Sequence, residues 1–364
     1  MGKRLRILYT IPNFNTAGSG KVLYDLAKGL DKSKFDVEIA CENRKGKFFE
    51  EVENLGLPIH IVKTKTPLKP YHSLFSRVWK IAKFYKQHDY DLVHSWQWSS
   101  DWTESLAARF AGCKWIYTKK AMGFKSKHWK IKSWLAHFII TINDDMQAYF
   151  PNKKAQKLIP LGIDTEYYSK QVRKESPTDT FHIITVANLV PVKGIEILIR
   201  AIGLVAEKNI KLTILGDDNN LYGDEMKQLS VDLKIDHLVT FLGKKLDVRP
   251  YMSEADLYVI PTLDEGRKEG MPMALVEAMS IGIPLLGSNI SGINFVLRAF
   301  QDLLFEAGNV QALKEKIEYI MSLNTTEREQ IGVSLRQYCI DHFSMEKFIS
   351  AHEELYTQLI TNKQ

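Results

Sequence analysis

The chain has few cysteines and lacks any long hydrophobic run. Cys41, Cys113 and Cys339 are odd in number, lie far apart and form no Cys-x-x-Cys pair, so the sequence predicts neither disulfides nor a zinc site. No uncharged apolar run approaches the ~20 residues that span a bilayer. The run after the basic start, 7–11, is too short for a signal peptide core. We therefore expect a cytoplasmic protein that associates with a membrane only peripherally, at its inner leaflet.

Metal-binding patterns and activated nucleophiles are missing as well. The ten histidines are scattered without a His-x-x-x-His pair, and no Gly-x-Ser-x-Gly elbow occurs. We therefore expect no metal-dependent hydrolysis, no metal site and no other cofactor. His94 follows a predicted strand, where the residues of a cleft usually lie. Its role stays open between a cleft residue and a core histidine.

The composition is that of an ordinary globular protein, with 45% hydrophobic and 25% charged residues among 364. At roughly 100 to 200 residues per domain, this length predicts two domains. The net charge of +6 is unevenly divided: residues 1–180 hold 31 Lys and Arg against 18 Asp and Glu, whereas the rest hold 18 against 25. Such a basic half favours an anionic partner, either a phosphate group, nucleic acid or an anionic bilayer.

Strand-like apolar runs alternate with stretches of helical periodicity along the chain. The predicted strands are 5–11, 36–41, 58–62, 91–95, 114–118, 138–142, 181–187, 211–215, 239–242, 257–260 and 284–286. The predicted helices are 20–30, 48–55, 73–88, 102–110, 309–321, 326–342 and 345–360, with others beginning near Gly194, Tyr222 and Pro272. This alternation predicts the α/β class with doubly wound parallel sheets.

The alternation of apolar runs stops after Ile163 and begins again at Phe181, which predicts a domain boundary between them. The predicted parts are a Rossmann-like domain at 1–170, a linker at 171–180, a second Rossmann-like domain at 181–344 and a helix at 345–364 that returns towards the first domain. Ligands of such sheets bind at the carboxyl ends of the strands, so we expect the two domains to face a central cleft.

The segment 269–279 follows a predicted strand and carries the strongest motif. Pro272 suits a first helical turn, where its missing N–H would be unpaired anyway. The amide groups of this helix start would bind a diphosphate, and Gly270 lets the main chain approach it. Glu269 and Glu277, before and inside the helix, could accept from hydroxyls at two ends of one ligand. The alternative is that Glu269 only favours the helix start and Glu277 is solvated.

Two other loops also lead from a strand into a helix. Lys193 precedes a helix start, where a cation is unusual unless an anion shares the site; the alternative is a solvated lysine. Gly18 and Ser19 lie in a glycine-containing loop that resembles a P-loop. That pattern needs Gly in place of Asn15 and Ser or Thr in place of Val22, so we reject it. The loop stays open between an anion or sugar contact and an ordinary tight turn.

Across nearly the whole chain, these motifs resemble in their order those of the retaining glycosyltransferases of family 4, the group 1 glycosyl transferases with the two-Rossmann GT-B fold. The mark of that family is a Glu-x7-Glu motif, matched by Glu269 and Glu277. The other matching segments are the glycine loop at Gly18, then 161–164, 193–194, 215–217, 241–243 and 255–257. The resemblance implies metal-independent transfer of a sugar, with retention, from a nucleotide-sugar of the UDP type to a hydroxyl acceptor.

The resemblance also implies roles for single residues. Lys193 would bind the diphosphate and Glu269 the donor sugar, and these two would be the catalytic residues. Glu277 would bind the ribose, and the loop after Gly243 the base. The implied donor-binding set is Asn188, Lys193, Gly243, Glu269, Gly270, Met271, Pro272, Met273, Leu275 and Glu277. The first domain would bind the acceptor, with candidate residues Gly18, Ser19, His94 and Lys120.

The sequence departs from the family pattern in three places. Asn188 stands where an Arg usually precedes the Lys by five residues, and Lys120 stands where a His usually follows Thr118 in a Thr-x-His pattern. The loop before Glu269 is long, and we hypothesise that its Arg267 or Lys268 replaces the missing Arg; the alternative is that both are solvated. Asn188 and Lys120 leave a second function open, an inactive nucleotide-sugar-binding relative. A third is a nucleotide-sugar epimerase with a similar fold, although the Glu-x7-Glu motif argues against it.

The acceptor is expected to be a lipid-linked or growing surface glycan. The stretch 114–134 interleaves seven lysines with Trp115, Phe124, Trp129 and Trp134. Such a stretch suits the interface of an anionic bilayer, where Lys125, Lys127, Lys130 and Lys132 would bind headgroups. The alternative is that the tryptophans are core residues with solvated lysines beside them. No nucleic-acid motif accompanies the stretch, so we do not expect nucleic acid as a partner.

Overall fold

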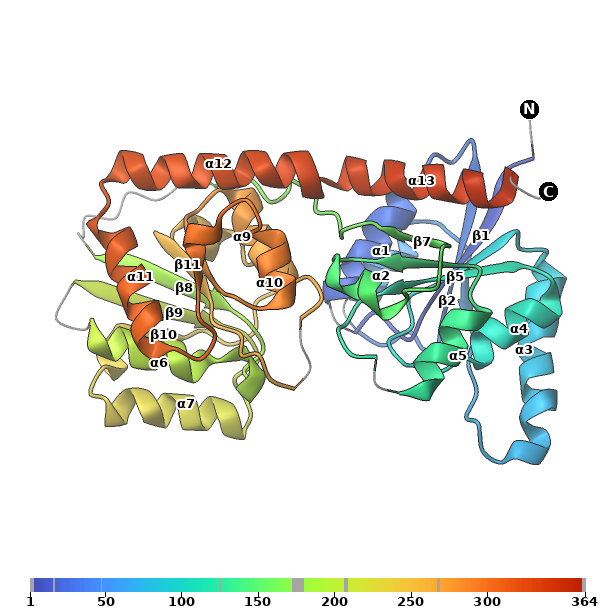
Figure 1. The fold of residues 1–364 in the computed structure, drawn as a ribbon, viewed down its shortest axis with the longest axis horizontal. Coiled ribbons are helices and arrows are strands. Elements are labelled where there is room, and N and C mark those ends of the chain that lie inside the picture. The colour runs from blue at the N-terminus through green and yellow to red at the C-terminus, as the bar shows by residue number, and fades with distance from the viewer. Residues whose placement is uncertain are drawn as a thin grey trace. The chain divides into compact units, whose positions relative to one another are not determined.

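The computed structural model describes residues 3–361, apart from 16, 47, 125, 172–179, 206–208 and 267–268. The chain divides into two compact units, which Figure 1 shows as ribbons. Unit 1 comprises Met1–Gly162 and Met345–Gln364, and unit 2 comprises Ile163–Ser344. None of the helices in the described ranges combines the length and the apolar character that a membrane crossing needs.

Unit 1 is built on a parallel sheet that has seven strands in the described residues, in the order β3-β2-β1-β4-β5-β6-β7. The strands are β1 (Leu5–Ile11), β2 (Phe35–Cys41), β3 (Ile59–Ile61), β4 (Leu92–Ser95), β5 (Lys114–Lys119), β6 (Phe138–Thr141) and β7 (Gln156–Leu158). The helices are α1 (Ala17–Gly29), α2 (Phe48–Glu53), α3 (Leu74–His88), α4 (Thr103–Ala111), α5 (Lys127–Leu135) and α13 (Met345–Thr361), with short 3-10 helices η1 (Tyr71–Ser73) and η2 (Asp145–Tyr149).

The order of these strands determines which helices share a face of the sheet. The chain moves from β1 outward through β2 to β3, and then from β4 outward in the opposite direction. Because such crossovers are right-handed, α1 and α2 cover one face and α3, α4 and α5 cover the other. The central strands β1 and β2 are largely buried on both faces, which explains their continuous apolar runs. Helix α13 packs against α1.

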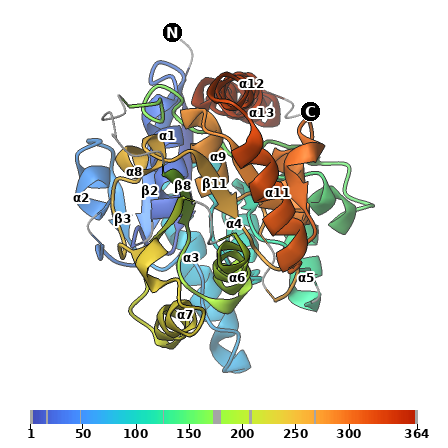
Figure 2. The ribbon, with the colours of Figure 1, turned by 90° about the vertical axis from the view of Figure 1, so that its left-hand side faces the viewer.

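Unit 2 is built on a second parallel sheet, with six strands in the described residues, in the order β10-β9-β8-β11-β12-β13. The strands are β8 (Phe181–Val186), β9 (Ile210–Leu215), β10 (Val239–Phe241), β11 (Leu257–Ile260), β12 (Leu285–Ser288) and β13 (Leu304–Phe305). The helices are α6 (Ile195–Leu204), α7 (Leu221–Asp232), α8 (Arg249–Ser253), α9 (Met273–Ile281), α10 (Ser291–Val296), α11 (Val310–Ser322) and α12 (Thr325–Phe343), with 3-10 helices η3 (Pro191–Lys193), η4 (Asp236–Leu238) and η5 (Gln301–Leu303). Figure 2 shows α6 and α7 below the strands and α9 and α12 above them.

Unit 2 begins earlier in the chain than the predicted boundary at residue 170. The amide of Ile163 donates to the carbonyl of Phe343 at 2.8 Å, and Ile163 forms a β-bridge with Ser344. The Arg336 guanidinium donates to the carbonyl of Tyr168 at 3.3 Å. Residues 163–170 thus pack on unit 2 through main-chain groups, which their polar side chains do not reveal. The predicted linker at 171–180 lies almost wholly outside the described residues.

Candidate active site

The strand order of unit 2 reverses between β8 and β11. From β8 the chain moves outward to β9 and β10 on one side, and from β11 outward to β12 and β13 on the other. The helices that follow β8 and β11, α6 and α9, therefore lie on opposite faces of the sheet. A crevice at the carboxyl ends of the strands opens at such a switch point and is where doubly wound sheets bind nucleotides.

Lys193 lies in the loop that follows β8, at the end of η3. The corner is tightly packed, because the amide of Leu263 donates to the carbonyl of Val192 at 2.8 Å. Gly194 has φ +65°, and a Cβ at this position would overlap the carbonyl oxygen of Pro261. Only glycine satisfies both conditions. The loops after β8 and β11 are thereby packed against each other.

The same two loops are joined through their side chains. The Nζ of Lys193 forms an ion pair with Oε1 of Glu269, and the two side chains are 22% and 24% exposed. The structure thus brings the two predicted catalytic residues into direct contact. A half-buried site strengthens electrostatic interactions relative to water while it stays accessible to a ligand.

Helix α9 starts at Met273, directly after Pro272 and four residues after Glu269, close to the start that the sequence predicts. Pro272 precedes the helix in extended conformation and its carbonyl accepts from the amide of Leu275 at 3.1 Å. Gly270, Met271 and Pro272 are buried, and Met273 is half-buried. The first amides of a helix lack partners within the helix and attract anions. The start of α9 therefore offers anion-binding groups beside the Lys193–Glu269 pair.

Glu277 lies further along α9 and is half-buried. Burial of Tyr258 on β11, together with the charge of Glu277, raises the pKa of the Tyr258 hydroxyl far above its usual range. The charge of Glu277 on α9 therefore lies within electrostatic range of Tyr258 on β11. Glu269 lies in the loop before α9 and Glu277 lies within the helix, which suits contacts to different parts of one ligand.

The loops after β8, β9 and β10 lie side by side and are connected by main-chain hydrogen bonds; this row of loops is called the shelf below. The amide of Leu189 donates to the carbonyl of Asp217 at 3.1 Å, and the amide of Gly216 donates to the carbonyl of Gly243 at 3.1 Å. Asn188 is exposed at the start of this shelf, and Gly243 is half-buried at its end. Arg267 and Lys268, which we hypothesised to replace the missing Arg, lie outside the described residues.

In unit 1, three of the predicted acceptor residues lie at the carboxyl edge of the sheet. Ser19, near the start of α1, accepts a hydrogen bond from Nε1 of Trp98 at 3.2 Å. Lys120 follows β5; its Nζ donates to the carbonyl of Trp96 at 2.6 Å and lies 5.6 Å from the centre of the Trp98 ring. Gly18 is exposed beside Ser19, and a Cβ there would meet nothing within 4 Å. Sequence reasoning missed Trp98, whose indole is 40% exposed.

His94 lies in the core rather than on a surface. It is fully buried, with Nδ1 2.7 Å from the hydroxyl of Tyr356 and Nε2 2.8 Å from the hydroxyl of Thr118. Burial lowers the pKa of His94 well below its usual range, so the ring is neutral. These contacts favour the structural interpretation of His94 and correct its inclusion among the acceptor residues.

The basic stretch 114–134 is divided between the core and the surface. Trp115, Lys119 and Lys132 are buried. The Nζ of Lys132 donates to the carbonyl of Ser99 at 2.9 Å, and burial lowers the pKa of Lys132 to about 8. The expectation that Lys132 binds headgroups is therefore wrong, because a buried ammonium cannot reach a membrane. Lys127, Lys130 and Trp134 are exposed, whereas Lys125 lies outside the described residues.

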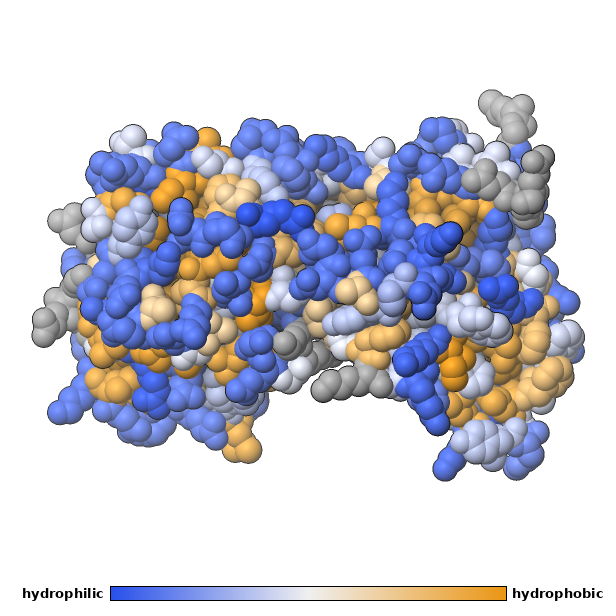
Figure 3. Space-filling view, viewed as in Figure 1, coloured by the Kyte–Doolittle hydropathy of each residue, from blue (hydrophilic) through white to orange (hydrophobic). Residues whose placement is uncertain are grey.

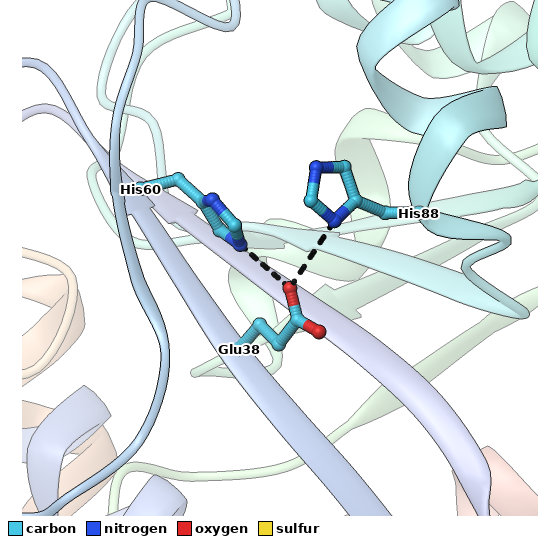
Figure 4. Close-up of side chains that lie close together, drawn as sticks. All are labelled: Glu38, His60 and His88. Carbon is cyan, nitrogen blue, oxygen red and sulfur yellow. Dashed lines mark hydrogen bonds and ion pairs between the residues drawn. The ribbon is translucent and has the colours of Figure 1, made fainter.

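Unit 1 also groups three potential metal ligands that the sequence analysis did not connect. Glu38 lies on β2, His60 on β3 and His88 at the end of α3 (Figure 4). Oε2 of Glu38 is 2.6 Å from Nε2 of His60 and accepts from the Tyr90 hydroxyl at 2.6 Å, while Oε1 accepts from the Arg6 guanidinium at 2.7 Å. A guanidinium in the cluster repels a second cation. The arrangement is that of a buried carboxylate with its hydrogen bonds satisfied.

Two sequence families together match most of the chain. The family described as Glycosyltransferase Family 4 matches residues 16–167, and the family described as Glycosyl transferases group 1 matches residues 169–337. The chain belongs to the family 4 glycosyltransferases.

Individual relatives agree with this assignment. The chain is 23% identical, over 92% of its length and 92% of the relative, to the UDP-Gal:alpha-D-GlcNAc-diphosphoundecaprenol alpha-1,3-galactosyltransferase of Escherichia coli. It is 22% identical to the capsular polysaccharide biosynthesis glycosyltransferase CapH of Staphylococcus aureus, over 83% of this chain and 86% of the relative.

The fold is shared with solved structures of the GT-B class. The structure of Anabaena Alr3699/HepE in complex with UDP and glucose has a TM-score of 0.80 and 20% identity, and the match covers 97% of this glycosyltransferase and 100% of that chain. The predicted fold class, two doubly wound Rossmann-like domains of the GT-B type, is confirmed.

Proposed function

We propose that this glycosyltransferase transfers a sugar from a UDP-sugar to a hydroxyl group of a lipid-linked or growing surface glycan, with retention of the anomeric configuration and without a metal ion. The observation that carries the proposal is the contact between Lys193 and Glu269 at the switch point of the unit 2 sheet. In this contact, a cation that suits a diphosphate lies beside a carboxylate that suits sugar hydroxyls. Doubly wound parallel sheets bind nucleotides at their switch point.

The donor would extend across the carboxyl edge of unit 2. Its diphosphate would lie between Lys193 and the start of α9, and its sugar would reach Glu269. Glu277, further along α9, would accept from the ribose hydroxyls. The base would lie against the loop after Gly243. The Escherichia coli relative is named for UDP-Gal, and the Anabaena structure is a complex with UDP and glucose, which supports a uridine donor here.

The reaction breaks the bond between the anomeric carbon and the diphosphate oxygen. Negative charge grows on the departing UDP, and a charged hydrogen bond from Lys193 contributes about 1.5 to 3 kcal/mol or more as that charge develops. The acceptor hydroxyl attacks from the face that UDP leaves, which retains the configuration, and its proton passes to a departing phosphate oxygen. Lys193 and the amides of α9 then neutralise the charge that a metal ion neutralises in other transferases.

The acceptor would bind at the carboxyl edge of unit 1. The Nε1 bond to Ser19 fixes the exposed Trp98 indole, and aromatic faces of this kind pack against the apolar faces of sugars. The Lys120 ammonium beside this ring suits an acceptor phosphate. The name of the Escherichia coli relative includes a diphosphoundecaprenol acceptor, which supports a lipid-linked acceptor. Such an acceptor places the reaction at the cytoplasmic surface of a membrane.

Calorimetry in the presence of a chelator would test the donor and its independence of metal. UDP and one or more UDP-sugars should bind, and other nucleoside diphosphates should bind more weakly. The anomer released by slow donor hydrolysis, read by NMR, tests retention. Binding only after addition of a divalent cation, or release of the inverted anomer, would contradict the proposal.

The inactive relative is the second candidate, favoured by Asn188 and Lys120 at positions where the family usually has charged or catalytic side chains. It predicts donor binding without hydrolysis. Hydrolysis of the bound UDP-sugar by purified protein, absent in the Lys193→Ala variant, would exclude it. Persistent binding with no turnover, in the presence of lipid-linked acceptors as well, would favour it over transfer.

A further inference from the structure

Unit 1 exposes large apolar side chains on the outer side of α3 and α5. Tyr71 of η1 and Phe75 of α3 are 68% and 65% exposed, and Trp134 of α5 is 77% exposed. Trp79 and Ile131, each one turn away on the same helices, are exposed as well. These five side chains, together with the lysines between them, are called the α3–α5 surface below. Within the described part of unit 1, the surface holds five of the seven exposed large hydrophobic residues.

Helix α4 joins the two sides of this surface. The ring of Phe75 stacks on Trp79 with an interplanar angle of 12°, and Phe110 of α4 lies 5.6 Å from Phe75 between ring centres. On the other side of α4, Nε of Arg109 donates to the carbonyl of Leu135 on α5 at 3.0 Å. Figure 1 shows α3, α4 and α5 together, and Figure 3 shows hydrophobic residues gathered over α3 and α4 beside strongly hydrophilic ones. Helix α4 therefore packs against both α3 and α5, and the three helices are neighbours on one face of the sheet.

The outer apolar residues are not required to complete the core. Helix α3 already buries a separate inner face on the sheet, formed by Val78, Ile81, Ala82 and Tyr85. An apolar patch that the fold does not bury, and that polar residues surround, marks an interaction site.

The charged residues in two long stretches of the sequence, which include α3 and α5, are all basic. Residues 54–88 contain seven Lys and Arg, residues 105–143 contain eight, and neither stretch contains a single Asp or Glu. Lys80, Lys83 and Lys86 are exposed on α3, and Lys127 and Lys130 are exposed on α5. The exposed aromatic side chains thus lie within a field of positive potential.

We propose that the α3–α5 surface docks on an anionic lipid bilayer. Trp and Tyr rings settle at headgroup depth, and lysines close to an anionic leaflet are attracted to it, so the surface has both features that such an interface selects. A second copy of the chain would set lysines against lysines and is disfavoured. The inference extends the proposed function, because a lipid-linked acceptor lies in a membrane. Of the predicted stretch 114–134, it keeps the exposed part on α5, leaves out the buried Lys132 and adds the outer side of α3.

Sedimentation of the full chain with vesicles tests the proposal. Vesicles that contain phosphatidylglycerol should carry the protein down, and phosphatidylcholine vesicles should not. Phe75→Ser with Trp134→Ser should lower the partition coefficient at least about tenfold, because two headgroup-depth rings are lost. Lys80→Glu with Lys130→Glu should also lower it at least about tenfold. Salt at about 1 M, where the Debye length is about 3 Å, should remove most of the binding.

Matched variants on exposed positions elsewhere separate docking from general effects of charge and stability. Lys32→Glu with Lys211→Glu, and Leu221→Ser with Tyr319→Ser, should leave vesicle binding within about twofold of the unchanged chain, since the attraction decays over a Debye length. All variants should keep the melting temperature and bind UDP with unchanged affinity.

Four results would overturn the docking proposal: equal binding to both kinds of vesicle, no binding to either, equal losses in the control variants, or a dimer that depends on Phe75 and Trp134 without vesicle binding. UDP titration of the same preparations separates this proposal from the proposed function. UDP binding without vesicle binding rejects only the docking surface, and vesicle binding without UDP binding rejects only the transferase assignment.

Discussion

At the scale of single residues, Lys193 and Glu269 hold opposite charges in contact at the ends of two different loops. Lys193→Ala should lower turnover at least about tenfold, because the departing diphosphate loses a charged hydrogen bond. The melting temperature should change little, since a partly exposed ion pair contributes only about 0 to 1 kcal/mol. Steady-state kinetics with saturating donor and a thermal melt provide both readings. Unchanged turnover would remove Lys193 from the site.

The two carboxylates of α9 and its entry loop should have separable effects on binding. Glu277→Gln should weaken UDP and UDP-sugar alike, by about tenfold, because the ribose is common to both. Glu269→Gln should spare UDP and weaken only the sugar-bearing donor. Calorimetric titration of each variant with each ligand distinguishes these outcomes. Equal losses in the four titrations would show that the carboxylates have no separate roles.

The buried carboxylate of Glu38 should make unit 1 sensitive to acid. Burial raises its pKa, but hydrogen bonds from Tyr90, His60 and Arg6 outweigh this and hold the pKa of Glu38 below its usual value. A lowered folded-state pKa stabilises the fold above the ordinary Glu pKa of about 4.3, and this stability is lost as pH falls through the folded-state value. Glu38→Gln should therefore cost about 1 to 3 kcal/mol at neutral pH.

Denaturant melts of the unchanged chain and of Glu38→Gln at several pH values check this expectation. The difference between them should shrink as the pH falls below about 4.3, because protonation removes the same charge that the substitution removes. Glu51→Gln, at an exposed position on α2, is a matched control and should show no such trend. A difference that stays constant down to low pH would contradict the role given to Glu38.

At the same scale, the sequence was a good guide to site residues that directly follow a strand. It was a poor guide to whether a given side chain is buried or exposed. Lys193 and Glu269 were identifiable because each comes after an apolar strand and before a helix, and parallel strands end at one edge. Trp98 also follows a strand, but a lone aromatic residue does not indicate whether it faces solvent. The burial of Lys132 was not predictable, because its desolvation is offset by a main-chain carbonyl that is distant in sequence.

At the scale of elements, the corner between η3 and α6 should tolerate no side chain at Gly194. Gly194→Ala forces a Cβ into the Pro261 carbonyl at a positive φ, so unit 2 should lose stability and donor affinity together. Gly56→Ala is a matched control, because its φ is +67° but nothing lies within 4 Å of the added Cβ. It should cost only about 1 kcal/mol of backbone strain and leave UDP binding unchanged.

Melting curves and UDP titrations of both variants provide the comparison. If Gly194→Ala binds UDP as tightly as Gly56→Ala does, the close approach of the two loops does not shape the donor site. A larger loss in Gly194→Ala, beyond the strain that the two positions share, is the expected result.

Elements that begin and end at characteristic residues, such as proline and glycine, were predicted well. The elements discussed below that lack such residues were missed. Helix α9 runs from Met273 to Ile281, between a proline that suits its start and Gly282, whose φ of +80° ends it. Helix α5 was not predicted, because three of its nine residues are lysines and its apolar periodicity is weak. Strand β13 has two residues and no pattern of its own, so only its pairing with β12 defines it.

At the scale of the whole molecule, the division of charge predicted from composition has a structural counterpart. The basic half of the sequence forms most of unit 1, where the α3–α5 surface and Lys120 offer cations. Unit 2 is the acidic half, and its cation at the switch point, Lys193, is paired with a carboxylate. A donor diphosphate would thus be attracted by a local site, and a membrane by a broad surface.

The return of α13 to unit 1 has a consequence for the order in which the ribosome delivers the chain. Tyr356 of α13 contacts His94 and Tyr9, whose hydroxyl lies 3.1 Å from that of Tyr356, so the last helix completes the interior of the unit that is made first. All of Ile163–Ser344 is synthesised in between, which takes about 10 to 40 s at bacterial elongation rates. During this interval nascent unit 1 exposes the apolar side chains that α13 later covers, and chaperones can bind them. Truncation before α13 therefore removes core residues such as Leu355 and Tyr356, and not a dispensable tail.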